Sequence, residues 1–203
     1  MGMPARIETE RRWTAAEVRA LQDAVYDEPN RRYERYELID GELIVTPAPV
    51  WKHQRALALL LVALERYVRG HRLGEVVFSP ADIELEPEGV TQPDLIVVPE
   101  SERTPEAQWS DIHRLLVAIE VLSPSTARYD RLTKRRYYLR NHVPEYWIVD
   151  TDARLVERWR SADAIRPEML DAVLTWHPDG ASEPFTLDLV SYFAEVHGET
   201  LGA

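Results

Sequence analysis

The sequence predicts one domain of the α/β or α+β class, built on a mixed β-sheet and a long buried helix. Three observations support this prediction. The 203 residues, of which 45% are hydrophobic and 29% are charged, suit a single globular core. Helix-like and strand-like apolar patterns follow one another along the chain. No internal repeat, low-complexity tract or long linker divides it, so we expect one continuous core.

The N-terminal part of the chain carries one helix signal and one hairpin signal. Thr14 and Glu17 form a capping-box pattern, which predicts a helix that continues to about Tyr26. The stretches 33–40 and 42–45 have the character of two strands, and the Asp-Gly pair between them suits a tight hairpin turn. This region therefore supplies a helix and a hairpin.

The middle of the chain combines a long helix with short strands. Residues 51–69 have helical periodicity and are apolar nearly all round in their centre, which predicts a helix packed on more than one side. Strand-like runs follow at 75–79, 82–86 and 94–98, separated by proline and turn-forming residues. We expect all three runs to belong to one sheet.

A polar loop then leads to a second alternation of strands and helices. The apolar run 115–122 is a strand candidate, and a basic helix is predicted from about 127 to 141. Two more strands are expected at 145–150 and 153–159. The tail is expected to hold short strands and a last amphipathic stretch at 187–196.

The composition excludes several classes of protein. The absence of cysteine rules out disulfide scaffolds, thiolate metal sites and cysteine nucleophiles, and fits a reducing compartment. The longest apolar run, 56–64, is far shorter than the roughly 20 residues of a membrane span, and residues 1–13 do not resemble a secretory signal. No glycine-rich phosphate loop, nucleophile elbow or His-Glu-x-x-His motif is present. We expect a cytoplasmic protein.

The charge of the chain is negative overall but uneven. The net charge of -11 argues against a protein that holds long nucleic acids by bulk attraction alone. Residues 128–142 nevertheless contain six basic side chains and one acidic side chain. Lysine is rare, since Lys52 and Lys134 are the only two among 24 basic residues. The six histidines are scattered, and each is expected at the surface or in packing.

Two acids stand where apolar residues are expected. Glu120 interrupts the apolar run 115–122, and an unpaired buried carboxylate requires a partner, a proton or a metal. Asp94 opens another apolar strand directly after Pro93. Two carboxylates on adjacent strands suit a hard cation such as magnesium, which takes oxygen ligands and activates water in phosphodiester hydrolysis.

Five sequence blocks carry a resemblance to a known family. They are Tyr36-Glu37-Leu38-Ile39-Asp40-Gly41-Glu42, Gln92-Pro93-Asp94, Ile119-Glu120-Val121-Leu122-Ser123-Pro124-Ser125-Thr126, Asp130 with Lys134, and Pro144-Glu145-Tyr146-Trp147-Ile148-Val149-Asp150. In order and spacing, the chain from about 33 to 159 resembles the Uma2 family (DUF820) of the PD-(D/E)XK nuclease superfamily. The resemblance implies a restriction-endonuclease-like core at 33–160, a helical extension at 1–32 and a tail at 161–203 that packs on the same domain.

The resemblance also implies a set of site residues. Asp94 and Glu120 correspond to the acidic metal ligands, with the backbone carbonyl of Val121 as a further ligand for Mg²⁺ or Mn²⁺. The lysine of the superfamily would fall at position 122, where this chain has Leu122. Lys134 on the following helix is the expected substitute, which would orient the attacking water or neutralise charge on the phosphate. A lysine is suggestive here because an arginine essentially cannot lose its proton.

An upstream acid and the aromatic residues complete the candidates. Glu37 matches an acidic position near the metal site, and His53 with Gln54 lies at the start of the central helix, within possible reach of it. The aromatic residues beside the basic helix suit core or dimer packing better than base stacking. They are Tyr137, Tyr138, Tyr146, Trp147 and Trp159. Alternation predicts that Tyr146 and Ile148 share one sheet face and Trp147 and Val149 the other.

Each assignment has a structural alternative. Asp94 could simply be a turn residue that opens a strand after proline. Glu120 could be paired with an arginine such as Arg128 or Arg131. Lys134 lies four residues after Asp130, so an ordinary ion pair on the helix surface is an alternative explanation. Glu37 could face solvent on its strand.

Three functions are compatible with these residues. The first is a Mg²⁺-dependent endonuclease acting on DNA, in which Arg128, Arg131 and Arg135 contact phosphates. The second is a non-catalytic module that binds nucleic acid or protein, suggested by Leu122 and by the acidic composition. The third is a metal-dependent hydrolase of small nucleotides, which suits an acidic surface. A homodimer is expected because nucleases that cut two strands often pair two sites.

Overall fold

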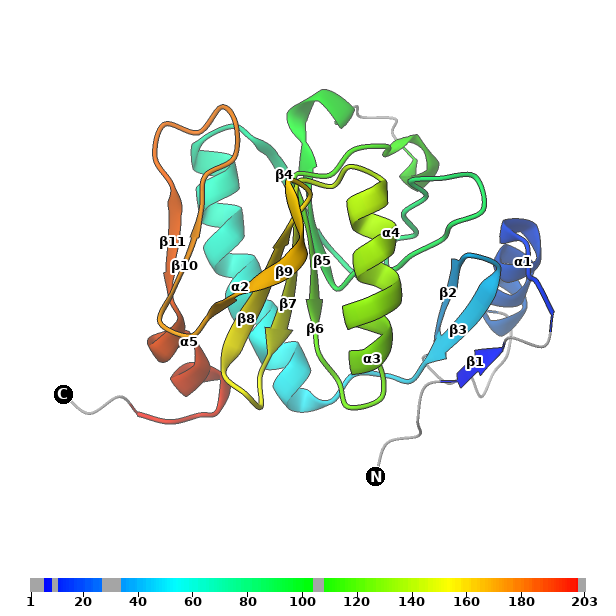
Figure 1. Cartoon of the computed structure of the whole chain (residues 1–203), viewed down its shortest axis with the longest axis horizontal. Coiled ribbons are helices and arrows are strands. Elements are labelled where there is room, and N and C mark those ends of the chain that lie inside the picture. Colours follow the sequence, from blue (N-terminus) through cyan, green and yellow to red (C-terminus); the bar gives the residue numbers. More distant parts are fainter. Residues whose placement is uncertain (1–5, 9–10, 27–33, 104–107, 201–203) are drawn as a thin grey trace.

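A six-stranded mixed sheet forms the centre of the computed structural model, which describes residues 6–8, 11–26, 34–103 and 108–200 (Figure 1). The strand order is β4-β5-β6-β7-β8-β9. The pair β6–β7 is parallel and the other neighbouring pairs are antiparallel. The strands are β4 Gly74–Phe78, β5 Leu95–Pro99, β6 Val117–Val121, β7 Glu145–Asp150, β8 Leu155–Arg160 and β9 Asp163–Leu170. The predicted mixed sheet is confirmed.

A small N-terminal unit packs beside this sheet. Its strands follow the order β1-β3-β2, and they are β1 Arg6–Glu8, β2 Arg35–Ile39 and β3 Glu42–Thr46. Asp40 and Gly41 turn the β2–β3 hairpin with φ angles of 55° and 77°, as the Asp-Gly pair predicts. Helix α1, Ala15–Tyr26, begins at the predicted capping box, where Glu17 Oε2 accepts from the Thr14 amide and the Thr14 hydroxyl accepts from the Glu17 amide.

Helices cover both faces of the central sheet (Figure 1). Helix α2, Trp51–Gly70, packs on one face together with α5, Leu189–Val196, and with the hairpin formed by β10, Val173–Trp176, and β11, Phe185–Asp188. The other face is covered by one helix that comprises α3 Ala127–Tyr129, a π-helical segment Asp130–Lys134 and α4 Arg135–Arg140. None of the helices in these described ranges has the length and apolar character of a membrane span.

Strand β7 shows why the sheet needs cover on both sides. Trp147 and Val149 belong to the core on the α2 face, whereas Tyr146 and Ile148 belong to the core on the α4 face. The predicted alternation is therefore confirmed. The long helix α2 contacts the sheet and α5, as expected for packing on more than one side, although Val62 remains exposed.

Three parts of the chain differ from the expectation. Residues 82–86 do not form a strand, because their only ladder contact is an isolated bridge between Ile83 and Thr91, and the Leu85 amide donates to the Tyr137 hydroxyl instead. The predicted polar loop contains two short 3-10 turns, Glu100–Glu102 and Trp109–Asp111. The tail contributes more than packing, since β9 is an edge strand of the central sheet.

Candidate active site

The two acids singled out in the sequence lie side by side. Strands β5 and β6 pair antiparallel with Leu95 opposite Ile119, which places Asp94 and Glu120 at neighbouring positions on the two strands. The Val121 amide donates to Asp94 Oδ2 at 2.9 Å and holds this carboxylate against the end of β6. Both carboxylates are buried, each with an exposed fraction of 2%. The fold thus brings together the acids that the sequence predicts on adjacent strands.

Asp94 has two further partners, Arg35 and His53, and we call these three residues the Asp94 group. Arg35 Nη1 donates to Asp94 Oδ1 at 2.6 Å, and His53 Nε2 contacts Asp94 Oδ2 at 2.9 Å. Arg35 is the first residue of β2, and His53 lies in the first turn of α2. Burial alone would raise the pKa of Asp94, but the Arg35 guanidinium and the His53 hydrogen bond hold it well below its usual value.

The other acids surround the lysine. Lys134 Nζ lies 2.8 Å from Glu120 Oε1, 2.9 Å from Glu37 Oε1 and 3.8 Å from Asp130 Oδ1, and all four side chains are buried. We call these four residues the Lys134 cluster. Its geometry overturns three alternatives: Asp130 and Lys134 are not a surface pair, Glu120 pairs with Lys134 and not with Arg128 or Arg131, and Glu37 does not face solvent.

A local widening of the helix accompanies this cluster. The five residues Asp130–Lys134 are π-helical, and the Arg135 amide donates to the Asp130 carbonyl five residues before it. The Tyr146 hydroxyl donates to the same carbonyl at 3.2 Å. Such π segments within α-helices occur frequently at functional sites. Here the segment begins and ends at the two helix residues that point into the cluster.

The Lys134 cluster contains three carboxyl groups and one ammonium group, and this imbalance shifts their pKa values. Burial raises the pKa of Glu120 well above its usual value, and it raises the pKa of Asp130 to about 6. Burial would lower the pKa of Lys134, but Glu120 and the other acids raise it well above its usual value. Lys134 therefore remains a cation, while its carboxylates compete for it.

Charge and ligand type fit a hard divalent cation. Within the described residues, four buried carboxylates face two permanent cations. When all four carboxylates are ionised, two negative charges therefore remain uncompensated. The acids are Glu37, Asp94, Glu120 and Asp130, and the cations are Arg35 and Lys134. Three hydrogen bonds occupy the Asp94 carboxylate, which has about four acceptor positions. Asp130 Oδ1 is buried without a hydrogen-bond partner among these residues.

The described part of the chain holds no set of three or more acidic, histidine or cysteine side chains that converge as metal ligands. Magnesium does not need such a set, because it keeps several waters and binds through one or two carboxylates together with substrate phosphate. Asp94 and Glu120, with the Val121 carbonyl, are the residues that fit this kind of coordination. Glu37 and Asp130 contact Lys134, as Glu120 also does, but neither lies beside Asp94 on the paired strands β5 and β6.

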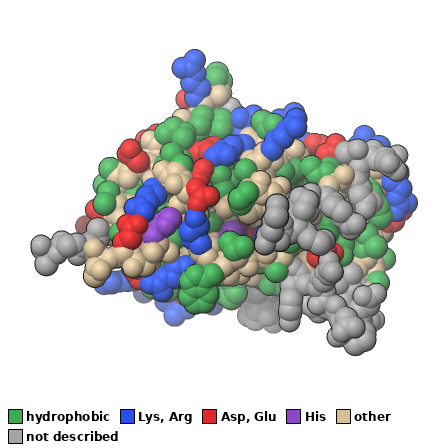
Figure 2. All heavy atoms as spheres, turned by 90° about the horizontal axis from the view of Figure 1, so that it is seen from below, with side chains coloured by type: hydrophobic (Ala, Val, Ile, Leu, Met, Phe, Trp, Pro, Cys, Tyr) green, Lys and Arg blue, Asp and Glu red, His purple; other side chains and the backbone are tan. Residues whose placement is uncertain are grey.

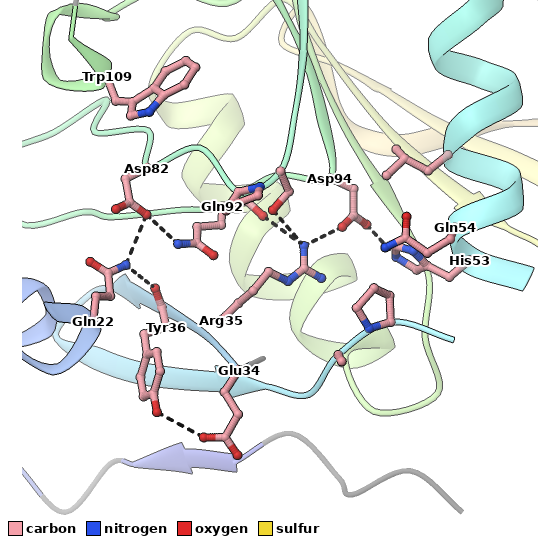
Figure 3. Close-up of a pocket in the computed structure, with 15 residues that line it drawn as sticks. Gln22, Glu34, Arg35, Tyr36, His53, Gln54, Asp82, Gln92, Asp94 and Trp109 are labelled. Carbon is pink, nitrogen blue, oxygen red and sulfur yellow. Dashed lines mark hydrogen bonds and ion pairs between the residues drawn. The ribbon is translucent and has the colours of Figure 1, made fainter. Parts of the chain in front are cut away.

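A pocket of about 640 Å³ opens beside the Asp94 group (Figure 3). Asp94, Arg35 and His53 form one part of its wall. A second part is a hydrogen-bond network in which Asp82 Oδ1 accepts from Gln22 Nε2 at 3.2 Å and from Gln92 Nε2 at 2.6 Å. The pocket therefore gives access to the Asp94 side of the site.

Two residues of the site were assigned no role from the sequence. His53 was noted as within reach of the site, although the histidines in general were expected at the surface or in packing, and it contacts Asp94. Arg35 had no assigned role. A strand places alternate residues on one face, so the position of Arg35 two residues before Glu37 was a signal that both point the same way. No local pattern marks His53, whose role depends on where α2 meets β5.

The basic helix offers less free positive charge than its sequence suggests. Arg131 Nε donates to Glu157 at 2.6 Å and its Nη2 donates to Asp150 at 3.0 Å, while the Arg135 guanidinium lies over the Trp159 ring. Arg128 is exposed. In Figure 2, basic and acidic side chains lie next to one another on the face shown. Internal ion pairs thus neutralise much of the local excess.

The aromatic residues near this helix belong to the core. The five rings that the sequence grouped are all buried, namely Tyr137, Tyr138, Tyr146, Trp147 and Trp159. Tyr138 packs against Tyr146 with ring centroids 5.0 Å apart. Core packing is confirmed, and these rings are not available for stacking on bases.

Comparison with known proteins places the chain in a family. Residues 17–186 match the sequence profile of Uma2, described as "Putative restriction endonuclease". The chain belongs to the Uma2 family. The resemblance predicted from the sequence blocks is thus confirmed, and the Uma2 match extends beyond 33–159 to include α1 and β9.

A solved structure shares the Uma2 fold of this chain. It is a putative nuclease of DUF820 from Anabaena variabilis ATCC 29413, with a TM-score of 0.65 and 22% sequence identity over 79% of this chain and 90% of that chain. At this identity the likeness concerns the fold, and it confirms the restriction-endonuclease-like mixed sheet flanked by helices. No match was found among the curated proteins.

Proposed function

We propose that this Uma2 protein is a divalent-metal-dependent endonuclease that hydrolyses phosphodiester bonds in nucleic acid, with DNA as the expected substrate. One observation carries the proposal. Asp94 and Glu120 lie on adjacent strands, next to a buried lysine, and the four buried acids of the site carry two more negative charges than Arg35 and Lys134 balance when all four are ionised. A site of this kind lacks the charge that a divalent cation provides.

Asp94, Glu120 and the Val121 carbonyl would hold Mg²⁺ or Mn²⁺. When bound, such a cation polarises a phosphoryl oxygen and lowers the pKa of a coordinated water. Because Lys134 remains protonated, its role is to neutralise charge on the phosphate and not to accept a proton. Lys134 reaches Glu120 from the helix that covers this face of the sheet, which supports the role of Lys134 as the substitute for the usual lysine. Leu122, at the usual lysine position, is only partly buried.

Glu37 is best explained as a positioning residue. Its Oε1 accepts from the Gln92 amide at 2.7 Å and from Lys134 at 2.9 Å. One carboxylate oxygen therefore fixes both the lysine and the backbone two residues before Asp94. Loss of Glu37 is expected to reduce activity through the placement of these two groups.

The contacts to nucleic acid remain predictions. Arg128 is the exposed member of the predicted set, whereas Arg131 and Arg135 would have to leave an ion pair and an aromatic ring, respectively. A dimer and a cytoplasmic location likewise remain expectations from the sequence.

The first test measures metal binding, because it requires no choice of substrate. Calorimetric titration of Mn²⁺ and Mg²⁺ into the wild type should show binding that is lost in the Asp94→Asn, Glu120→Gln double variant. Cleavage of single-stranded and duplex DNA should fall by at least about 100-fold in either single variant. Asp171→Asn is the control, since it removes one acidic charge from an exposed turn outside the site.

Two outcomes would overturn the proposal. One is an Asp94→Asn or Glu120→Gln protein that is folded and cleaves as fast as the wild type. The other is a wild type that binds neither ion at millimolar concentration and cleaves no DNA or RNA in its presence. The second outcome would favour the non-catalytic binding module.

A further inference from the structure

The pocket beside Asp94 contains polar groups that the proposed hydrolysis does not use. These groups belong to Asp82 and Gln92, together with Gln22, on the part of the wall beyond Arg35 (Figure 3). A volume of about 640 Å³ lies within the range of small-molecule binding sites. The pocket also reaches the carboxylate of Asp94 itself, so a ligand here would lie next to the reacting centre.

The direction of each hydrogen bond in this wall can be assigned. A carboxylate only accepts hydrogen bonds, so the amides of Gln22 and Gln92 must both turn their NH₂ groups toward Asp82 Oδ1. The oxygen of Gln92 then points away from Asp82, as Figure 3 shows. Gln92 is only 7% exposed, and its Oε1 is buried without a hydrogen-bond partner among the described residues.

The wall therefore presents unused acceptors. Asp82 Oδ1 has two partners, whereas its Oδ2 accepts no hydrogen bond from the residues that the structure describes. Burial raises the pKa of Asp82, which reflects the poor hydration of this carboxylate. Gln92 Oε1 is an unpaired buried acceptor, which is costly, and Asp82 Oδ2 belongs to a half-buried side chain. A ligand that supplies N–H donors would pair with both oxygens.

An aromatic ring lines the same pocket close to Asp82. Trp109 lines the pocket with 46% of its surface exposed, and in Figure 3 it lies beyond Asp82 on the side away from Gln22. Exposed aromatic side chains beside polar acceptors are suited to a flat ring with N–H groups along one edge. Arg35 lines the Asp94 side of the same pocket, where its Nη1 donates to Asp94 Oδ1.

We propose that this pocket is a nucleobase subsite, in which Asp82 and Gln92 bind a base that carries an exocyclic amino group and Trp109 stacks on it. The nature of the ligand rests on the proposed function. Guanine should bind most tightly, because its N1–H and amino group are adjacent donors, whereas thymine and uracil place oxygens on both sides of a single N–H. The substrate is then single-stranded, or it extrudes a base next to the phosphate that is cleaved.

The neutralised arginines favour the same substrate. Duplex binding depends on many free Lys and Arg side chains along the phosphates, and here Arg131 and Arg140 are held by acids of the protein itself. A site that grips one base in a pocket needs fewer phosphate contacts.

The test measures binding without cleavage. Fluorescein-labelled thymidine pentanucleotides with or without a central guanine are titrated with the protein in EDTA and followed by anisotropy. The guanine-containing strand should bind about tenfold more tightly than the all-thymidine strand. The same guanine-containing strand paired in a duplex should bind about tenfold more weakly, because the base must leave the stack.

Two variants identify the groups responsible. Asp82→Asn keeps the oxygen that accepts from the glutamines and replaces the other oxygen by NH₂, so the preference for guanine should fall about tenfold while the protein stays folded. Trp109→Ala should weaken both strands about tenfold without changing their ratio. Trp51→Ala, at an 84% exposed tryptophan that does not line the pocket, should change nothing.

The outcomes separate this inference from the proposed function. Equal affinity for the two strands, or an Asp82→Asn protein with an unchanged preference, overturns the base subsite even if metal-dependent cleavage is observed. A clear base preference in a protein that never cleaves would retain the subsite and overturn the nuclease. Tighter binding of the duplex would also contradict the inference.

Discussion

The Asp94 group and the Lys134 cluster lie side by side and differ in how well their charges are balanced. In the Asp94 group, one carboxylate has an arginine and a histidine, and its pKa is lowered. In the Lys134 cluster, three carboxylates share one ammonium, and the pKa values of Glu120 and Asp130 are raised. The carboxylates of both are buried to the same extent, so the number of cations for each acid decides which carboxylates ionise.

This difference indicates what each half of the site can do. Asp94 is fixed in place by three hydrogen bonds, which leave about one acceptor position of its carboxylate in a set orientation. An underpaired group of acids is destabilised until a further cation arrives. The Lys134 cluster is therefore the half that gains most from a divalent ion.

Removal of the ammonium should have the largest effect on stability. Lys134→Ala leaves three buried carboxylates without a cation and should lower the free energy of unfolding by about 3–5 kcal/mol, measured by urea denaturation at pH 7. The other lysine is the control. Lys52 forms an exposed ion pair with Asp152, so Lys52→Ala should cost at most about 0.5 kcal/mol. Equal effects of the two substitutions would contradict the comparison.

Removal of the arginine should have an intermediate effect that depends on pH. Because the pKa of Asp94 is lowered by folding, its ionisation stabilises the protein above the unfolded pKa of 3.8, and this contribution is lost as the pH falls. Arg35→Met should therefore cost about 2–3 kcal/mol at pH 7 and progressively less below about pH 4. Urea denaturation at several pH values measures the trend, and a cost independent of pH would show that Arg35 stabilises only by packing.

The smallest effect on the free energy of unfolding is expected at Asp130, where the substitution should stabilise the protein. Its pKa of about 6 in the folded protein lies above the usual 3.8, so folding favours the protonated acid, and stability is lost as the pH rises from 3.8 through about 6. Asp130→Asn should raise the free energy of unfolding by about 2 kcal/mol at pH 8, and this gain should disappear below pH 3.8. Destabilisation by Asp130→Asn at pH 8 would show that its attraction to Lys134 outweighs its burial.

Much of the fold could be predicted because its signals are local. The capping box at Thr14, the Asp40–Gly41 turn and the alternation along β7 each depend on a few neighbouring residues, and all three are confirmed. Residues 82–86 failed for the same reason. Their pattern suits a strand, but the Leu85 amide donates to the hydroxyl of Tyr137, which is distant in the sequence.

The site could be predicted only in part. Glu120 is visible in the sequence because it interrupts an apolar run, Asp94 because it opens one, and Lys134 because lysine is rare in this chain. Arg35 and His53 carry no such mark. The basic helix was misleading, because the sequence counts its charges without the acids that neutralise them in the fold.

The sequence by itself determined the order of helices and strands, the family and the two misplaced acids, since these follow from periodicity, turn chemistry and local blocks. Tertiary structure alone decided which charges meet: Arg35 and His53 with Asp94, and Glu37 with Lys134. The physical reason is that the strength of an ion pair depends on distance and burial, and both are set when segments distant in the sequence pack together.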